Sequence, residues 1–387
     1  MNGEDLKVKF NLCGMGAKTN VIPSGIDEFG AAFSYNTGNL FFNYACELIA
    51  DLLPSRMPWG IEPESVNQKS KGLLLPMANH IGKHVDLSIN GLRLDGVDVP
   101  VVAMGLGAQF DTQSLSSLDE IPKGTIAWLR SLSEKGDAVN ISLRGDFTYE
   151  VLERLGLSKS AVPLGCPSLF ISKDRALGSS IKAKLSKVSV SSLIPSVAAG
   201  NPHLNKGSKA ERVLINWVST FGGDYIVQHP RNLICISNGW FESLSDIDYQ
   251  VLTKNWFPGF SNGDVQRWFL KHSRTYISVP QWVASFSSRD LCVGTRIHGV
   301  QAAIQSGTPA LCVYVDSRTK ELCEFMKIPC VSIKSFEEKM SLSDVLTILE
   351  TWDWDEFDLN RKLLANKTLS FLVDNGVKPS SHLMSLV

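Results

Sequence analysis

The sequence predicts an α/β protein made of two Rossmann-like domains that face each other across a cleft. Short apolar runs, several of them ending in glycine, alternate with amphipathic stretches of helical spacing, a pattern typical of βαβ units and parallel sheets. The alternation occurs in both halves of the chain. The length of 387 residues exceeds the ~250 to 300 residues at which a single core stops growing, so two domains are expected.

The expected elements alternate between helix and strand along the chain. Those of the first half are a helix at 41–53, a strand at 99–105, a short strand at 140–144, a helix at 148–155 stopped by Gly156, and an extended segment with turns at 162–171. Those of the second half are a helix at 210–220, strands at 225–228 and 275–278, a helix at 281–286, a strand at 291–294, a helix at 301–306 and a strand at 310–314.

A shift in composition marks the expected domain boundary. Residues 172–209 are rich in Ser, Lys, Ala and Gly, with Pro195 and Pro202 as breakers. The predicted division is an N-terminal domain at 1–175, a linker at 176–209 and a C-terminal domain at 210–387. An amphipathic helix at about 355–373 is expected to pack back on the first domain.

Composition excludes several classes of protein. The net charge of -1 and the absence of a Lys/Arg block argue against nucleic acid as a partner, because binding to a phosphate backbone needs a concentrated basic surface. The first residues lack the pattern of a signal peptide, and no run approaches the ~18 apolar residues of a transmembrane segment. A cytoplasmic protein is expected, peripheral to the membrane if its substrate is lipid-linked.

The cysteines and histidines give little indication of a metal. The eight cysteines are scattered, mostly within apolar runs, without a C-x-x-C pair or a Cys/His cluster at zinc spacing, so reduced and packed thiols are expected. His80 and His84 have a spacing that suits a metal on a helix, but no third ligand is evident. A solvated helical face is the competing interpretation, and no metal is predicted.

The stretch Gly-Thr-Arg-Ile-His-Gly at 294–299 is the most informative of the chain. It follows an apolar run and leads into a helix, which places Arg296 and His298 at a helix N-terminus, with Thr295 and Gly299 beside them. Free amide groups and the helix dipole favour an anion there. The alternative is a surface charge and a satisfied polar histidine.

Two further arginines follow predicted strands. Arg144 ends the strand at 140–144, although an ion pair with Asp146 or Glu150 would also explain it, and Arg318 follows the strand at 310–314. Ligands of open α/β sheets collect at the carboxyl ends of strands. Three arginines around one cleft predict a site for a multiply charged anion, since the guanidinium group suits carboxylates and phosphates.

Weaker signals come from other strand and helix ends. Gly38 and Asn39 precede a helix and suit either an anion site or a plain N-cap, and a glycine pair before Gln109 lacks the third glycine of a dinucleotide fingerprint, which argues against NAD. His229 ends a predicted strand and could face the cleft. One aromatic group suits either sugar stacking or core packing; it consists of Trp240, Trp256 and Trp268.

Several of these motifs together resemble those of the polysaccharide pyruvyl transferase family. The resemblance covers roughly residues 36–330, and its order and spacing fit; its most specific part is the Arg-x-His-Gly motif with the Gly-x-Pro that follows it. The motifs that carry it are Ile-Ser-Leu-Arg-Gly-Asp at 141–146, Leu-Gly at 155–156, Gly-Cys-Pro-Ser at 165–168, Gly-Thr-Arg-Ile-His-Gly at 294–299, Gly-Thr-Pro at 307–309, and the Gly-Asn pair at 38–39.

The resemblance implies a fold of the GT-B type, with a first domain that binds the acceptor and a second that binds the donor. The donor would be phosphoenolpyruvate, the acceptor a sugar of a polysaccharide or of a lipid-linked glycan precursor, and the product a cyclic pyruvate ketal; no cofactor is implied. His298 would move the protons and Arg296 and Arg144 would clamp the donor. Substrate contacts are expected from Thr295, Gly299, Arg318, Asn39, Gly38, Gln109 and His229.

Two other functions fit the same residues. A GT-B glycosyltransferase would use Arg296 and His298 to hold the phosphates of a nucleotide sugar and would take its base from a carboxylate of the first domain. The second half shows no carboxylate pair spaced to hold a ribose. A non-catalytic glycan-binding protein is the third possibility, and replacement of His298 alone would separate a binder from an enzyme.

Overall fold

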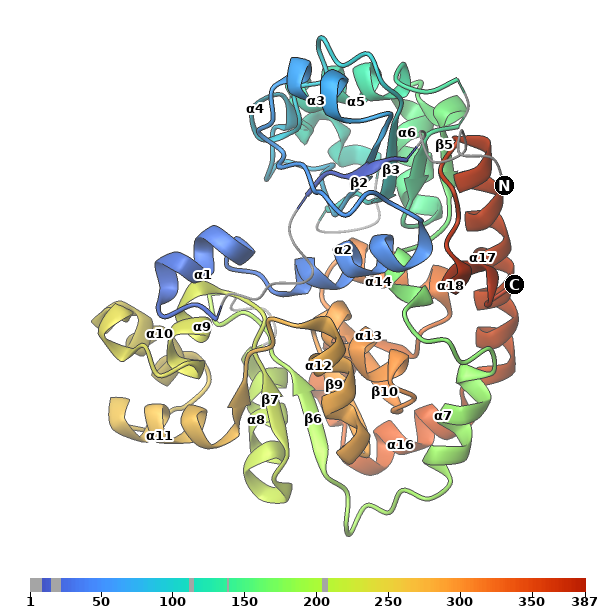
Figure 1. Cartoon of the computed structure of the whole chain (residues 1–387). Helices are drawn as coiled ribbons and strands as arrows, with labels where there is room; N and C mark the ends of the chain where they lie inside the picture. The colour runs from blue at the N-terminus through green and yellow to red at the C-terminus, as the bar shows by residue number, and fades with distance from the viewer. Residues whose placement is uncertain (1–8, 15–21, 111–114, 138, 204–207) are drawn as a thin grey trace.

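Two parallel sheets form the two lobes of the computed structural model, which describes residues 9–14, 22–110, 115–137, 139–203 and 208–387 (Figure 1). In the first sheet the strand order is β1-β2-β3-β4-β5, with β1 Asn11–Leu12, β2 Leu73–Pro76, β3 Val101–Leu106, β4 Ile141–Leu143 and β5 Ala161–Pro163. In the second it is β11-β10-β9-β6-β7-β8, with β6 Pro195–Ala198, β7 Asp224–Ile226, β8 Ser273–Arg274, β9 Leu291–Gly294, β10 Ala310–Tyr314 and β11 Cys330–Ser332. The predicted architecture of two α/β halves is confirmed.

Helices cover both sheets, as the alternating pattern predicts. In the first half they are α1 Ile26–Phe33, α2 Gly38–Ile49, α3 Pro63–Lys69, α4 Leu87–Asn90, α5 Lys123–Ser133 and α6 Asp146–Arg154. In the second half they are α7 Leu177–Leu185, α8 Ser208–Phe221, α9 Arg231–Ser237, α10 Asp246–Asn255, α11 Asn262–His272, α12 Val279–Ser285, α13 Ile297–Gln305, α14 Ser317–Met326, α15 Ile333–Lys339, α16 Leu342–Thr351, α17 Trp354–Asp374 and α18 Ser381–Met384.

The second sheet is doubly wound. Counted from β6, its strands have the order 3-2-1-4-5-6, and the order reverses between β6 and β9. Ligands of such sheets bind in the crevice outside the carboxyl ends of the two strands at this switch point. The segment that follows β9 is the Gly-Thr-Arg-Ile-His-Gly stretch, so the topology places it at this crevice.

The segment predicted to be a linker contains part of this second sheet. Residues 176–209 include α7 and β6, and β6 pairs with both β7 and β9 at the centre of the sheet. The sequence Pro-Ser-Val-Ala of β6 has little β-branched character, which hides it from pattern analysis. Residues 204–207 of that segment lie outside the described part of the chain. The strand predicted at 275–278 is wrong in position, because the observed strand β8 ends at Arg274.

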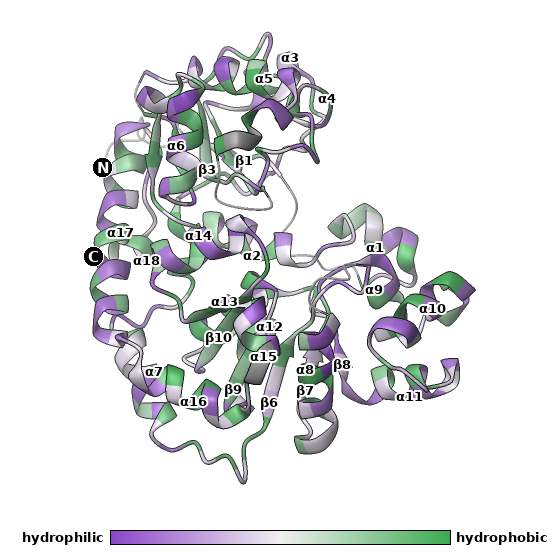
Figure 2. Ribbon diagram, turned by 180° about the vertical axis from the view of Figure 1, so that it is seen from behind, coloured by the Kyte–Doolittle hydropathy of each residue, from purple (hydrophilic) through white to green (hydrophobic). Residues whose placement is uncertain are grey.

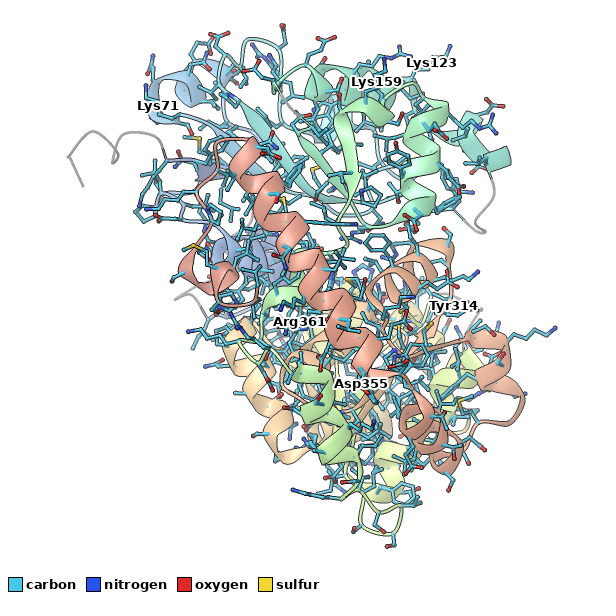
Figure 3. The ribbon with its side chains drawn as sticks, turned by 90° about the vertical axis from the view of Figure 1, so that its right-hand side faces the viewer. Lys71, Lys123, Lys159, Tyr314, Asp355 and Arg361 are labelled. Atoms are coloured by element: carbon cyan, nitrogen blue, oxygen red, sulfur yellow. The ribbon has the colours of Figure 1, made fainter. Side chains whose placement is uncertain are left out.

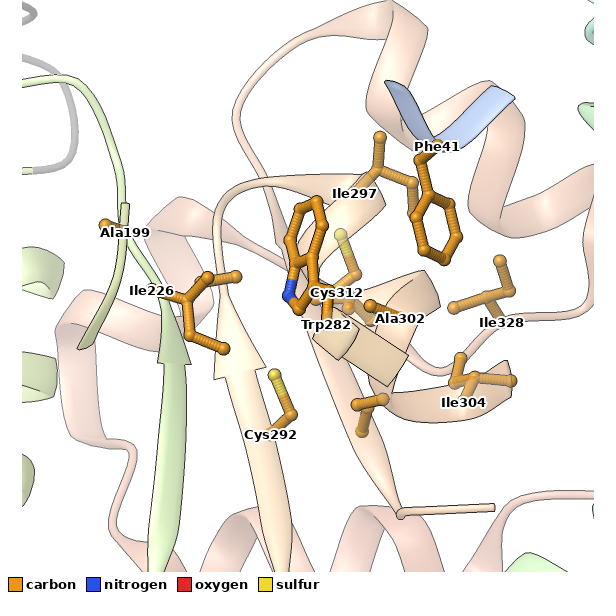
Figure 4. Close-up of a cluster of buried hydrophobic side chains, with 14 of the residues drawn as sticks. Phe41, Ala199, Ile226, Trp282, Cys292, Ile297, Ala302, Ile304, Cys312 and Ile328 are labelled. Atoms are coloured by element: carbon orange, nitrogen blue, oxygen red, sulfur yellow. The ribbon is translucent and has the colours of Figure 1, made fainter. Parts of the chain in front are cut away.

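Helix α2 packs on the second lobe although it lies between β1 and β2 of the first sheet in sequence. Phe41 of α2 contacts Trp282 of α12 edge to face, with ring centroids 5.6 Å apart, and Ile297 of α13 lies beside them (Figure 4). Coloured by hydropathy, the strands are mostly hydrophobic, while hydrophilic residues concentrate on the helices and loops around them (Figure 2). The start of α2 is therefore fixed next to the start of α13, which carries the residues of interest.

The C-terminal helices join the two lobes. α17 runs along the side of the molecule and contacts α7, α14 and α18, and α18 contacts α2 (Figure 1). The chain between them pairs with the end of α2, because the backbone N–H of Asp51 donates to Lys378 O at 2.8 Å. Among the helices of the described residues, none is both long enough and apolar enough to cross a membrane.

Arg361 of α17 should stabilise the fold strongly (Figure 3). Its buried guanidinium donates to three backbone carbonyls, of Leu169 at 2.9 Å, Ser172 and Asp174. Arg361→Met keeps the apolar stem but leaves these carbonyls without the donor, at about 1 to 3 kcal/mol for each buried unsatisfied group. We expect the free energy of unfolding in urea to fall by at least ~3 kcal/mol. The exposed neighbour Lys362 is the control, and equal effects of Arg361→Met and Lys362→Met would contradict the prediction.

Candidate active site

Small residues hold α13 tightly against the carboxyl end of β6. Ala198 is in register with Gly294, and the backbone N–H of Thr295 donates to Ala198 O at 3.2 Å. A Cβ added to Gly299 would lie 2.6 Å from both Ala198 Cβ and Gln228 Nε2. The structure thus places Gly299, expected to contact substrate, in a packing contact outside the cavities described next.

Two connected cavities lie at this crevice, between the lobes. The outer cavity has a volume of about 450 Å³ and is lined by Asn36, Asn79, His84, Gln109, Gly200, Asn201, Glu211, His229, Trp256, Thr295, Arg296, Val315, Asp316 and Arg318. The inner chamber, of about 40 Å³, is lined by Asn36, Asn39, Phe42, Ala78, Asn79, Arg144, Gln228, Arg296, Ile297, His298 and Arg318. Most of the residues predicted from sequence therefore meet here. A larger cavity, of about 1020 Å³, lies away from them between the end of α2 and α18.

Arg144 is a buried cation without a carboxylate partner. Its side chain is 1% exposed, its Nε donates to Gly105 O at 2.9 Å, and its guanidinium lies 5.9 Å from the ring centroid of Phe42. Among the described residues no ion pair forms with it, so pairing with Asp146 or Glu150 does not explain its position. Burial lowers its pKa, but a guanidinium stays charged at neutral pH.

Arg296 and Arg318 add two further cations. Within the described part of the chain, nothing forms a hydrogen bond or an ion pair with the guanidinium of Arg296, whose pKa is lowered to about 10 by burial and by the charge of Arg318. Arg318 pairs with Asp316 at 3.1 Å, while its buried Nε has no partner. Of the three guanidinium groups, only that of Arg318 forms an ion pair within the described residues, while the buried Glu211 and Glu321 act on Arg296 and Arg144 from beyond ion-pair distance. The two unpaired guanidinium groups leave an excess of positive charge.

Hydrogen bonds across the cleft fix Arg318 relative to the first lobe. Ser317 at the start of α14 donates through Oγ to Phe110 O at 2.9 Å. Further along α14, Glu321 accepts from the backbone N–H of Thr148 at 2.6 Å and from its hydroxyl at 2.8 Å. These bonds connect the second lobe to α6 and to the loop after β3. These contacts position Arg318 of the second lobe relative to Arg144 of the first.

His298 lies in the inner chamber as a neutral imidazole. Its ring centroid is 5.6 Å from that of Phe42, and Cys166 Sγ lies 4.0 Å from Nε2. Burial lowers the pKa of His298 well below its usual value, and the charges of Arg144, Arg318 and Arg296 lower it further. Gly38 borders this ring, since a Cβ there would lie 3.3 Å from His298 Nδ1.

Other predicted residues line the outer cavity or lie outside it. Asn79 Nδ2 donates to Gln109 Oε1, and His229 Nδ1 contacts Tyr35 O at 3.2 Å. Trp256 lines the outer cavity, whereas Trp240 and Trp268 pack against aromatic rings of the core.

The interpretation of His80 and His84 as a helical pair is wrong, because both lie in the irregular segment after β2. His80 Nδ1 accepts from the backbone N–H of Ala78 at 3.0 Å, and His84 Nε2 lies 2.7 Å from Asn79 O. The described residues contain no cluster of three His, Cys, Asp or Glu side chains suited to a metal.

Sequence reasoning missed several polar residues of the cavities. Glu211, Asp316 and Gln228 each line one of them. The signal for Asp316 was present, since it follows β10, lies two residues before Arg318 and caps α14 by accepting from Thr319 N at 2.9 Å. Nothing in the sequence of an amphipathic helix distinguishes a buried glutamate such as Glu211 from an exposed one.

A profile of the polysaccharide pyruvyl transferase family matches residues 70–317. The chain belongs to that family. As a member of the polysaccharide pyruvyl transferases, it carries Arg144, Arg296 and His298 within the matched segment, whereas Asn39 and Arg318 lie outside it. No curated protein matches its sequence.

Solved structures of similar shape are sugar enzymes. The UDP-N-acetylglucosamine 2-epimerase of Rickettsia bellii aligns with a TM-score of 0.46 and 13% identity over 94% of this chain and 96% of its own. The UDP-GlcNAc 2-epimerase of Neisseria meningitidis bound to UDP-GlcNAc aligns with a TM-score of 0.43 and 11% identity over 91% of this chain and 84% of its own.

The pKa of His298 should respond to the charge of Arg144. In the free protein we expect the imidazole to stay neutral through pH 6, because burial and three guanidinium groups oppose its protonation. Arg144→Met removes one of these charges and should raise the pKa toward 6.5. Histidine proton and carbon shifts in NMR titrations measure both values, with His298→Gln to assign the signal. A pKa near 6.5 in the unaltered protein would contradict the prediction.

Proposed function

We propose that this polysaccharide pyruvyl transferase moves pyruvate from phosphoenolpyruvate to a sugar and closes a cyclic ketal across two of its hydroxyl groups. One observation carries the proposal: three guanidinium groups surround a neutral imidazole, and among the described residues only one of them, that of Arg318, is paired with a carboxylate. Phosphoenolpyruvate presents a carboxylate and a phosphate on one small skeleton. Such a polyanion compensates the excess charge, and arginine suits both of its groups.

The chemistry needs a proton donor close to the anion. A proton adds to the methylene carbon of the donor, positive charge develops on the central carbon, and one sugar hydroxyl attacks there. The bond to the phosphate oxygen breaks, and the second hydroxyl forms the second C–O bond. Over the whole reaction the two hydroxyls lose two protons. One of these protons is balanced by the proton that converts the methylene carbon to a methyl group, and the other leaves with the phosphate.

His298 suits the proton transfer to carbon. It is neutral in the free protein, because burial and neighbouring arginines disfavour its charge. A bound carboxylate and phosphate would offset those arginines and raise the pKa of the imidazole, so that donor binding itself produces the imidazolium acid. Arg296 and Arg144 would stabilise the negative charge of the departing phosphate.

The acceptor is proposed to enter through the outer cavity. Its wall combines amide, hydroxyl and carboxyl groups with the face of one indole, from Trp256. Such a mixture suits a sugar, whose ring has apolar faces and a polar edge. The acceptor would belong to a polysaccharide or a lipid-linked precursor, in agreement with the family.

Binding of phosphoenolpyruvate should depend on Arg296. Removal of a guanidinium that binds a charged group in a partly desolvated site costs about 2 to 3 kcal/mol. At 1.4 kcal/mol per tenfold, Arg296→Ala should weaken binding roughly 30- to 100-fold by calorimetry, while the exposed Arg130→Ala leaves it unchanged. Binding of UDP-sugars or free UDP without any binding of phosphoenolpyruvate would instead favour the glycosyltransferase alternative.

Replacement of His298 should separate binding from turnover. Because the imidazole is neutral in the free protein, His298→Gln should retain the affinity for phosphoenolpyruvate within a few fold. Loss of the proton donor should lower the rate of phosphate release at least ~100-fold with an acceptor present. A p-nitrophenyl pyranoside that turns over serves as acceptor, and phosphate is measured directly. An unchanged rate would remove His298 from the mechanism.

A further inference from the structure

Glu211 is a buried carboxylate in the wall of the outer cavity, and it has no cation partner. It belongs to α8 and is 2% exposed. The hydroxyl of Tyr225 donates to its Oε1, and the backbone N–H of Gly200 donates to the carboxylate as well. Across the described residues no Lys, Arg or His lies within ion-pair distance of it. Two neutral donors therefore hold this carboxylate. In folded proteins a carboxylate is usually paired with a cation or exposed to water.

The absence of a side chain at Gly200 leaves this carboxylate at the surface of the cavity. A Cβ there would lie 2.4 Å from Glu211 Oε2 and 3.0 Å from Thr295 Oγ1. Since the φ of Gly200 is not in the left-handed region, space rather than backbone conformation is what this glycine provides. Any larger residue would cover Oε2, so Gly200 gives a ligand access to it.

The reaction proposed above requires two proton acceptors, one for each attacking hydroxyl. His298 lies in the inner chamber and, after giving its proton to the methylene carbon, can accept one of the two. The other hydroxyl needs a separate base on the side from which the acceptor enters. Arg296 lines both cavities, and its charge acts on Glu211 in the outer cavity as well as on His298 in the inner chamber.

We propose that the outer cavity binds a pyranoside with two free hydroxyl groups, and that Glu211 accepts the proton of the hydroxyl that attacks first. This inference rests on the proposed function. In the step, the hydroxyl oxygen forms a bond to the central carbon of phosphoenolpyruvate while its proton passes to Glu211 Oε2. The proton later leaves with the phosphate, which restores the carboxylate.

The other titratable groups of the outer cavity are engaged in other contacts. Asp316 pairs with Arg318 and caps α14, and Arg318 lowers its pKa. His229 is bound to Tyr35 O, and burial lowers its pKa to about 4. His84 contacts Asn79 O in an exposed loop. Glu211 is the carboxylate of the outer cavity that has no cation within ion-pair distance among the described residues, whereas Asp316 is paired with Arg318.

The electrostatic surroundings of Glu211 suit a base that works near neutral pH. Burial raises its pKa to about 7, against the hydrogen bonds from Tyr225 and Gly200 and the charge of Arg296, which lower it. A base with a pKa close to the operating pH is both available and strong. Bound phosphoenolpyruvate offsets Arg296, so the pKa in the complex should lie at or above this value.

The test measures kcat against pH at saturating phosphoenolpyruvate, from phosphate release, with a panel of p-nitrophenyl α- and β-pyranosides as acceptors. In the unaltered enzyme an acidic limb at or above about pH 7 is expected, since Glu211 must be ionised. Glu211→Gln should lower kcat about 100-fold and abolish this limb. Tyr225→Phe keeps the ring but removes a bond that favours the carboxylate, so the limb should move to higher pH.

Glu153→Gln is the control. Glu153 is an exposed carboxylate of α6 and lines neither the outer cavity nor the inner chamber. The acidic limb should stay in place in this variant. Calorimetry should show that phosphoenolpyruvate still binds to Glu211→Gln.

The outcomes separate the two proposals. If phosphoenolpyruvate does not bind to the unaltered enzyme, the proposed function fails. If it binds but no pyranoside turns over, or if Glu211→Gln keeps the kcat and the acidic limb of the unaltered enzyme, the role of Glu211 is overturned while the donor site stands. A limb that Tyr225→Phe leaves in place, or that Glu153→Gln moves, would likewise assign it to another group.

Discussion

Uncompensated positive charge is the constraint on which the rest of the site depends. A buried guanidinium is costly unless its protons are bound and its charge is balanced. Arg144 is surrounded by carbonyl oxygen and an aromatic face, which satisfy hydrogen bonds but supply no negative charge. Among the described residues the guanidinium of Arg296 has neither a hydrogen bond nor an ion pair, and that of Arg318 is paired with Asp316. An anionic ligand therefore gains more from this site than from a surface with paired arginines, because Arg144 and Arg296 have no internal ion pair that must break first.

The charges of the three arginines also require a fixed arrangement of the two lobes. Arg144 follows a strand of the first sheet, while Arg296 and Arg318 follow neighbouring strands of the second. The three positive charges repel one another. Contacts elsewhere in the molecule must therefore keep the two lobes together. The bonds from Ser317 and Glu321 across the cleft do so locally, and α17 with its buried Arg361 does so over the length of the molecule. The packing of α2 on the second lobe completes the inner chamber from a third direction.

Much of this arrangement could be predicted from sequence because it depends on strand ends. β9 and β10 are apolar, bounded by glycine or turn residues, and were predicted at their observed positions; Arg296 and Arg318 follow from them. β6 could not be recognised, since small residues that allow close packing with α13 also weaken the strand pattern. The burial of Glu211 beside the cavity depends on its contacts with Tyr225 and Gly200. These contacts arise from tertiary structure, so no local sequence pattern predicts them.

Gly299 shows a different limit of motif reasoning. Its place in the Arg-x-His-Gly motif suggests contact with substrate, yet the structure uses it to bring α13 against β6. The two roles are linked physically. A side chain at this position would displace the first turn of α13 from the carboxyl end of β6, and His298 lies in that turn. A residue can therefore be required by the chemistry of a motif without touching the reacting atoms.

The site also separates its two proton-handling groups by charge. His298 lies among three arginines, which favour the neutral imidazole, and Glu211 lies behind one arginine and two neutral donors, where burial favours the protonated acid. In the empty site, both groups are thus biased toward their uncharged forms. A polyanionic donor changes the balance more strongly for His298, because it offsets all three arginines there. In the proposed mechanism, charge on the donor, rather than movement of the protein, would bring the imidazole to the protonated state that the first step needs.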